Sequence, residues 1–204
     1  MVQQQATTKS QNNNHQVVIE RNGIKVKNDD LRNFQREEEV SVNIVMLFLD
    51  YLNALQSFYK AEYKNSKNRN LFYAIKISPK QDDPRQVKYK ISEPNFRKIY
   101  ADSSILDNYD KIVILMEVDG RWIVSVYHAA KENLFVIDFL ATNLSNIESQ
   151  KLCSDAIWIV QKELLGAKVN SLDYYEDYKL NYLSHCGLYA LNYAYKCMNT
   201  MEIE

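Results

Sequence analysis

Cys186 and the glycine that follows it are the residues of this chain whose types and position best suit covalent chemistry. They open an apolar segment whose spacing predicts a helix running to about Met198. A thiol in the first turn of a helix lies at the positive end of the helix dipole, which favours the thiolate. Gly187 leaves room for another backbone to approach the sulfur. The pair therefore predicts a nucleophilic cysteine.

A nucleophilic cysteine also needs a base within hydrogen-bond reach, and an acid or amide that orients the base. The chain has only three histidines, and His15 lies in a polar N-terminal tail. His185 is adjacent to Cys186, and neighbouring side chains at a helix start diverge by roughly 100°. His128 ends the strand predicted to begin at Arg121, at an odd offset that turns it to the opposite face unless a bulge intervenes. None of the three is well placed as the base.

Composition predicts a single globular domain at residues 17–204, preceded by a polar tail at residues 1–16. The 204 residues are 46% hydrophobic and 12% aromatic, which is enough for a sizeable core. The Gln- and Asn-rich tail is too polar to bury anything, so we expect a binding partner to hold it if it is ordered.

Charge and cysteine usage exclude several classes of partner. The net charge is −1 with acids and bases interspersed, which indicates neither a nucleic-acid face nor a membrane-surface patch. No apolar run reaches spanning length, and we expect no membrane insertion. The cysteines, Cys153, Cys186 and Cys197, are odd in number and lack metal-site spacing. We therefore expect no metal, no cofactor and a reducing location such as the cytoplasm.

The apolar patterns predict the elements that must position Cys186. A hairpin or extended segment is expected from Val17 to Val26, and one helix from residues 28–30 to about Tyr63. Residues 64–70 and 78–94 read as surface excursions. Stretches rich in β-branched and aromatic residues predict strands at Leu71–Ile77, Lys111–Val118, Arg121–Tyr127 and Asn133–Phe139.

The second half of the chain returns to helical spacing. Apolar residues from Ile147 to Leu165 predict a helix, and a polar, tyrosine-rich loop is expected from Asp173 to Tyr182. The order of elements predicts an α+β fold: a central, mostly antiparallel sheet flanked by helices, with Cys186 at a helix N-terminus.

The order Trp122, Asp138, Cys186-Gly187 resembles the ubiquitin-like-protein-specific cysteine proteases of the SUMO-protease group, over most of residues 24–200. The resemblance implies a papain-like, SUMO-protease-like fold. It implies that Cys186 holds the nucleophile position and that Asp138 holds the position of the residue that orients the base. Trp122 would line the tunnel that binds the Gly-Gly tail of the substrate.

The chain departs from the family at the residues that perform the chemistry. Arg121 stands where the family has its base histidine, and a guanidinium cannot accept a proton at physiological pH. Leu180 replaces the glutamine that stabilises the oxyanion, and Asn181 is the nearest amide. Glu39-Val40-Ser41-Val42 replaces a Trp-Leu-Asn-Asp element, and His185 replaces an aspartate.

Plain structural roles compete with each of these interpretations. Asp138 could form an ion pair with Arg121, and Trp122 is as well suited to the core as to a tunnel. The tyrosines of 173–182 could form a contact surface or a solvated loop. One helical stripe holds Cys186, Ala190, Tyr193 and Cys197, as expected of small buried residues in a core.

These observations favour a catalytically inactive protease fold that acts as a binding or structural subunit of a larger assembly. Its partners would be other protein chains, contacted by residues 1–16, and a ubiquitin-like protein is a further candidate. The alternative is a divergent cysteine peptidase that cleaves after the C-terminal Gly-Gly of a ubiquitin-like protein. A third reading is a module that binds such a protein around Trp122 without cleaving it.

Overall fold

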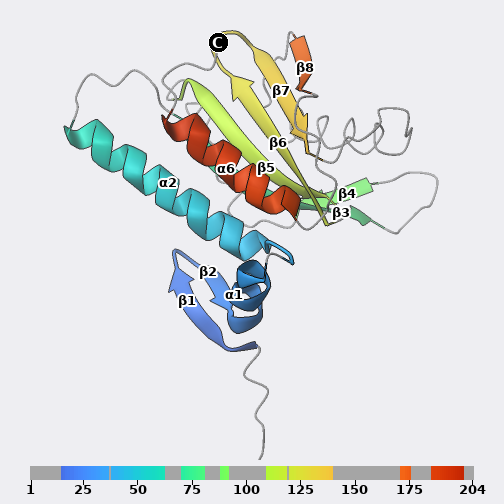
Figure 1. Ribbon diagram of the computed structural model, residues 1–204. Coiled ribbons are helices and arrows are strands. Elements are labelled where there is room, and N and C mark those ends of the chain that lie inside the picture. The colour runs from blue at the N-terminus through green and yellow to red at the C-terminus, as the bar shows by residue number, and fades with distance from the viewer. Residues whose placement is uncertain are drawn as a thin grey trace, which may run out of the picture.

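In the part of the chain that the structure describes, a mixed six-stranded sheet carries helices α2 and α6 across one face (Figure 1). The computed structural model describes residues 15–36, 38–62, 70–80, 88–91, 109–118, 120–139, 171–175 and 185–199. The tail up to residue 14, the helix predicted from Ile147 to Leu165, and both Cys153 and Leu180 lie outside these ranges. The predicted α+β architecture is confirmed.

A small N-terminal unit precedes the sheet. Strands β1 (Val17–Arg21) and β2 (Ile24–Lys27) pair antiparallel around Asn22 and Gly23, whose φ angles of 51° and 82° suit a two-residue hairpin turn. Asp50 of α2 anchors the turn, with 2.7 Å to Arg21 Nε and 3.0 Å to Asn22 Nδ2. The predicted hairpin is therefore confirmed.

Two helices replace the single helix that the sequence predicted after residue 28. Helix α1 (Asn28–Gln35) and helix α2 (Val42–Glu62) are separated by a short connector. Ser41 caps α2, because its Oγ accepts a hydrogen bond from Ile44 N–H at 3.4 Å. Val40 just before it is buried in the core. The prediction was wrong because the apolar spacing continues through a residue that packs at the break rather than within a helix.

The strands of the sheet run in the order β4-β3-β5-β6-β7-β8. Antiparallel pairs join β4 to β3, β5 to β6 and β6 to β7, whereas β3 and β5 pair in parallel, as do β7 and β8. The predicted antiparallel pairing is therefore found for β5, β6 and β7, whereas the sheet as a whole is mixed. The strands are β3 (Asn70–Lys80), β4 (Lys88–Ile91), β5 (Lys111–Val118), β6 (Arg121–His128), β7 (Asn133–Asp138) and β8 (Ser171–Tyr175).

Two of these strands occupy segments that the sequence assigned to loops. β3 continues through Pro79 and pairs with β4, inside the predicted surface excursion at 78–94. β8 includes residues 173–175 of the predicted tyrosine-rich loop, and residues 176–182 lie outside the described part. β4 and β8 are the two edge strands of the sheet. Each forms because it pairs with one neighbouring strand, although its own sequence pattern for a strand is weak.

Helices α2 and α6 (Cys186–Asn199) start at the same end of the sheet. Val40, just before α2, packs against Gly187 in the first turn of α6. At the other end Asn70 links the two helices: its Nδ2 donates to Cys197 O at 2.8 Å, and its carbonyl accepts from Gln56 Nε2 at 2.8 Å. The helices therefore run in the same direction, and both N-termini lie beside the start of β6.

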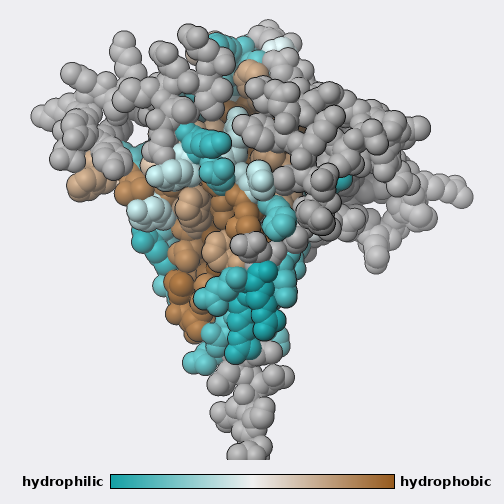
Figure 2. Space-filling model, viewed as in Figure 1, coloured by the Kyte–Doolittle hydropathy of each residue, from teal (hydrophilic) through white to brown (hydrophobic). Residues whose placement is uncertain are grey.

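The core lies between this helix pair and the sheet. It contains the stripe predicted from the sequence, since Cys186, Ala190 and Cys197 are all buried and Tyr193 packs against them. Apolar surface remains outside, over the hairpin and the adjoining part of α2 (Figure 2), where Val17, Val18 and Ile19 are exposed. Of the helices in the described ranges, none is long and apolar enough to cross a membrane.

Candidate functional site around Cys186

Cys186 begins α6, as the sequence predicted, and its sulfur lies against the backbone at the start of β6. Trp122 N–H donates a hydrogen bond to Cys186 Sγ at 3.4 Å. The residue is only 1% exposed. The thiol is therefore packed into the protein at the position where a nucleophile would need access to a substrate.

Burial raises the pKa of the Cys186 thiol above its ordinary value. The backbone N–H groups of Trp122 and Gly187 favour the thiolate, but the nearby Asp138 carboxylate opposes them. The expectation that the helix N-terminus makes this thiol ionise readily is therefore wrong, because desolvation is the larger effect. A raised pKa disfavours the thiolate, which is the form of cysteine that attacks a substrate.

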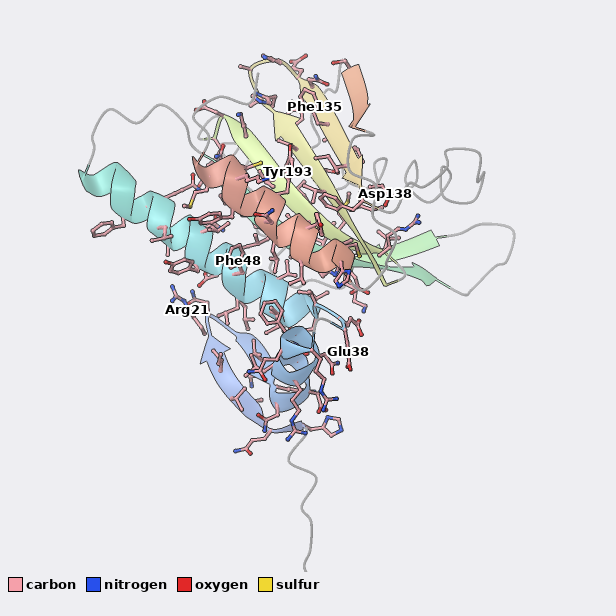
Figure 3. The ribbon with its side chains drawn as sticks, in the orientation of Figure 1. Arg21, Glu38, Phe48, Phe135, Asp138 and Tyr193 are labelled. Carbon is pink, nitrogen blue, oxygen red and sulfur yellow. The ribbon has the colours of Figure 1, made fainter. Side chains whose placement is uncertain are left out.

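Arg121 and Asp138 form the ion pair that the sequence suggested. Asp138 lies directly opposite Ile123 in the β6–β7 ladder, so Arg121 is its diagonal neighbour on the same face. Arg121 Nη1 is 3.2 Å from Asp138 Oδ2, and the two side chains are 18% and 5% exposed. Figure 3 shows Asp138 at the end of β7, beside the start of β6. Both charges lie close enough to Cys186 to act on the pKa of its thiol.

The histidines lie where the sequence placed them. His128 is at the far end of β6, opposite Lys111 in an unbroken register with β5, so it is roughly 23 Å from Arg121 along the strand. Burial, then Lys111 and Lys131, lower its pKa, against Asp110, which raises it. His15 lies beside Asp29 of α1, 3.8 Å away. The prediction that His128 cannot serve Cys186 is confirmed.

His185 immediately precedes α6 and is partly buried. Among the described residues, the groups that act on the Cys186 pKa are the N–H groups of Trp122 and Gly187 and the charges of Asp138 and Arg121.

Val40 occupies the space beside the nucleophile position, and the sequence did not reveal it. Trp122 Nε1 donates to Val40 O at 3.1 Å, and Trp122 is 2% exposed. A Cβ placed on Gly187 would lie 2.7 Å from Val40 Cβ and 3.0 Å from Trp122 Cδ1. The room that Gly187 provides is therefore filled by a valine of the same chain. Trp122 is a core residue here, the plainer of the two predicted roles.

A second ion pair closes the side of Trp122 that faces β5. Glu117 lies opposite Trp122 in the ladder and is buried. Its Oε2 is 2.8 Å from Lys76 Nζ on β3, whose side chain is half exposed. No local pattern predicts this pair, because its members come from two strands that are far apart in the sequence and pair in parallel.

Among the described residues, no group of three or more His, Cys, Asp or Glu side chains is arranged to bind a metal ion. Cys186 and Cys197 are both free thiols. The site that remains is a buried thiol, a hydrogen-bonded tryptophan and an arginine–aspartate pair.

No family model matches the chain, and no curated protein matches it by sequence. Solved structures of a SUMO protease nevertheless share its fold. The C-terminal Ulp1 protease domain, in complex with Smt3, the yeast orthologue of SUMO, superposes with a TM-score of 0.55 at 14% identity, covering 90% of this chain and 77% of that one. Ulp1 with its catalytic cysteine oxidised to a sulfenic acid gives 0.54 at 14% identity, covering 91% and 79%. This chain therefore has an Ulp1-like protease fold.

Proposed function

We propose that this chain is a catalytically inactive, SUMO-protease-like domain that acts as a binding or structural subunit of a protein assembly. The observation that carries the proposal is the buried ion pair of Arg121 and Asp138. A base in this position must accept the proton of the thiol, and a guanidinium remains protonated in proteins. The pair leaves the thiol without the group that would activate it.

The state of Cys186 supports the same conclusion independently. Its pKa is raised by burial, and its residue is 1% exposed. A reactive cysteine is partly exposed in a surrounding that stabilises the thiolate, and a structural one is buried and inert. Cys186 resembles Cys197, a buried residue of the same helix whose pKa burial raises to about 11.

The proposed partners are proteins. Ulp1 binds Smt3 in the solved complex, so a ubiquitin-like protein is one candidate ligand for this chain. We further propose that residues 1–16 contact other chains of an assembly, because so polar a tail has little to bury against its own domain. The free thiols Cys186 and Cys197 suit a reducing compartment such as the cytoplasm.

A divergent cysteine peptidase that cleaves after Gly-Gly is the second candidate. The hydrogen bond from Trp122 N–H to Cys186 Sγ favours it, since this donor would stabilise a thiolate. Its base is unassigned, and a partner would have to supply one.

The test is covalent capture. The full chain is incubated with SUMO or ubiquitin carrying a C-terminal vinyl sulfone, and adducts are read by mass spectrometry. We expect no adduct at Cys186. Non-covalent binding of the chain to SUMO or ubiquitin without the vinyl sulfone is measured separately by calorimetry. An adduct that forms with the wild type and disappears in Cys186→Ala, but not in the matched Cys197→Ala, would establish the peptidase and refute the proposal.

The assembly role is tested with the tagged full chain expressed in its native cells. We expect defined protein partners to copurify, and crosslinks to join residues 1–16 to them. Removal of residues 2–14 should weaken that recovery, while the far-ultraviolet circular dichroism of the domain stays the same. A chain that is recovered alone and monomeric, with or without the tail, would contradict the assembly role.

A further inference from the structure

The connector of residues 38–41 is fastened at both ends to the helices that it joins. Glu38 N–H donates to Asn33 O of α1 at 3.0 Å. At the other end, Ser41 O accepts from Val45 N–H at 3.1 Å. The connector is therefore a short strap held to α1 at one end and to α2 at the other.

The middle of the strap packs on Trp122, the residue whose backbone contacts the Cys186 sulfur. Val40 is 4% exposed, and its carbonyl accepts the Trp122 Nε1 hydrogen bond at 3.1 Å in a buried setting. The backbone N–H of the same tryptophan donates to Cys186 Sγ. One residue, Trp122, thus links the strap to the thiol.

Gly187 interlocks with the strap from the other side. A Cβ at this position would approach Val40 Cβ to 2.7 Å and Val40 Cγ2 to 2.9 Å, well inside the ordinary separation of non-bonded carbon atoms. The strap therefore lies directly on the first turn of α6, against the residue next to Cys186. Its fit depends on the missing side chain.

We propose that residues 38–41 form a closed gate over Cys186, and that the thiol becomes accessible when Val40 withdraws while the rest of the domain stays folded. Opening breaks the Trp122–Val40 hydrogen bond and exposes one valine side chain. Exposure of Cys197 instead requires the far end of α6 to separate from Asn70. Local openings of this kind occur more often than global unfolding. The gate does not depend on whether the domain is catalytic.

The test is the rate at which iodoacetamide alkylates each thiol in the folded full chain. The thiolate displaces iodide and forms a thioether, and trypsin, which cleaves after Lys179 and Lys196, places Cys186 and Cys197 in separate peptides for mass spectrometry. We expect Cys186 to react faster than Cys197, and far more slowly than it does in urea. Val40→Ala should accelerate Cys186 about tenfold, because fewer buried methyl groups oppose opening, and leave Cys197 unchanged.

A matched substitution separates a gate from a general loss of stability. Val45→Ala removes the same atoms from a buried position of α2 outside the strap, so it should change both thiols by a similar factor. Gly187→Ala and Trp122→Phe should act like Val40→Ala, since the first displaces Val40 and the second removes its hydrogen bond. If Val40→Ala folds poorly, either of these two variants can test the gate in its place.

Three results would overturn the gate. One is a Cys186 rate in the wild type that equals the rate in urea, which would mean that nothing covers the thiol. Another is equal rates for Cys186 and Cys197, which would mean that only global unfolding exposes them. The third is a Val40→Ala effect no larger at Cys186 than at Cys197. Covalent capture by a ubiquitin-like protein plays no part in these measurements, so the gate and the proposed function can fail separately.

Discussion

Replacement of Arg121 by methionine should destabilise the domain more than its surface position at a strand end would indicate. Arg121→Met keeps an unbranched stem and removes the guanidinium 3.2 Å from Asp138. The gross attraction at that distance is about 5 kcal/mol for an effective dielectric constant near 20. Removal of one partner from a buried pair typically costs about 3–5 kcal/mol, because the other charge stays behind. We expect a loss in that range.

The exposed fractions of the Arg121 and Asp138 side chains predict that the two single substitutions destabilise the domain by different amounts. The Asp138 side chain is only 5% exposed and short, whereas that of Arg121 is 18% exposed and has a long, flexible stem. Asp138→Asn should therefore cost less, about 1–2 kcal/mol, because the freed guanidinium can turn towards solvent. The double variant should recover about 2–3 kcal/mol of the sum of the single losses, since neither charge is left unpaired.

The assay is urea unfolding of each variant, followed by tryptophan fluorescence and far-ultraviolet circular dichroism. Arg21→Met is the matched control: its ion pair with Asp50 is shorter, at 2.7 Å, but the side chains are 48% and 25% exposed. Such an exposed pair should contribute at most about 1 kcal/mol. If Arg121→Met costs no more than this control, or less than Asp138→Asn, burial does not set the strength of the Arg121–Asp138 pair.

Two further substitutions probe the other end of α6. Burial raises the pKa of Cys197 from 9.0 to about 11, so the folded state holds the thiol proton more tightly than the unfolded state does. The stability that this proton contributes is fully present below pH 9 and is lost as the pH rises from 9 through 11. Urea titrations from pH 8 to 11 should show a fall in stability that is roughly 2 kcal/mol smaller in Cys197→Ala than in the wild type, because the raised pKa of Cys186 contributes in both proteins. An equal fall in both proteins would contradict the burial of the Cys197 thiol. Asn70→Ala removes the donor to Cys197 O and should lower the free energy of unfolding by about 1–3 kcal/mol. Hydrogen exchange should become faster in the last turn of α6 and stay the same in its first turn. An equal acceleration along the whole of α6 would contradict a local role for Asn70.

The sequence predicted the elements whose pattern is strong over their whole length. β5, β6 and β7 are continuous β-branched and aromatic runs, and the start of α6 at Cys186 follows from its apolar spacing. The Arg121–Asp138 pair could also be predicted, because adjacent antiparallel strands place their ends together. Local pattern and pairing geometry were sufficient in these cases.

The sequence did not predict the features that depend on contacts between distant segments. The break between α1 and α2 depends on Val40, which is apolar like the helix residues around it but packs against Trp122 and Gly187. The Cys186 pKa was predicted in the wrong direction for the same reason: the helix dipole is a local feature, whereas desolvation comes from residues far away in the chain. β8 was missed because its polar residues carry little strand signal.

An active thiol and a stable core make opposite demands on the positions around Cys186. Catalysis needs a polar, accessible thiol and a neutral base, and both leave groups unsatisfied or exposed in the resting protein. In this chain Arg121 neutralises the buried carboxylate of Asp138, and Val40 fills the space beside Gly187. Each contact supplies packing or charge pairing that an open site would lack. Arg121 and Val40 therefore favour a closed, packed region around Cys186, and Gly187 fits that packing because a side chain there would collide with Val40.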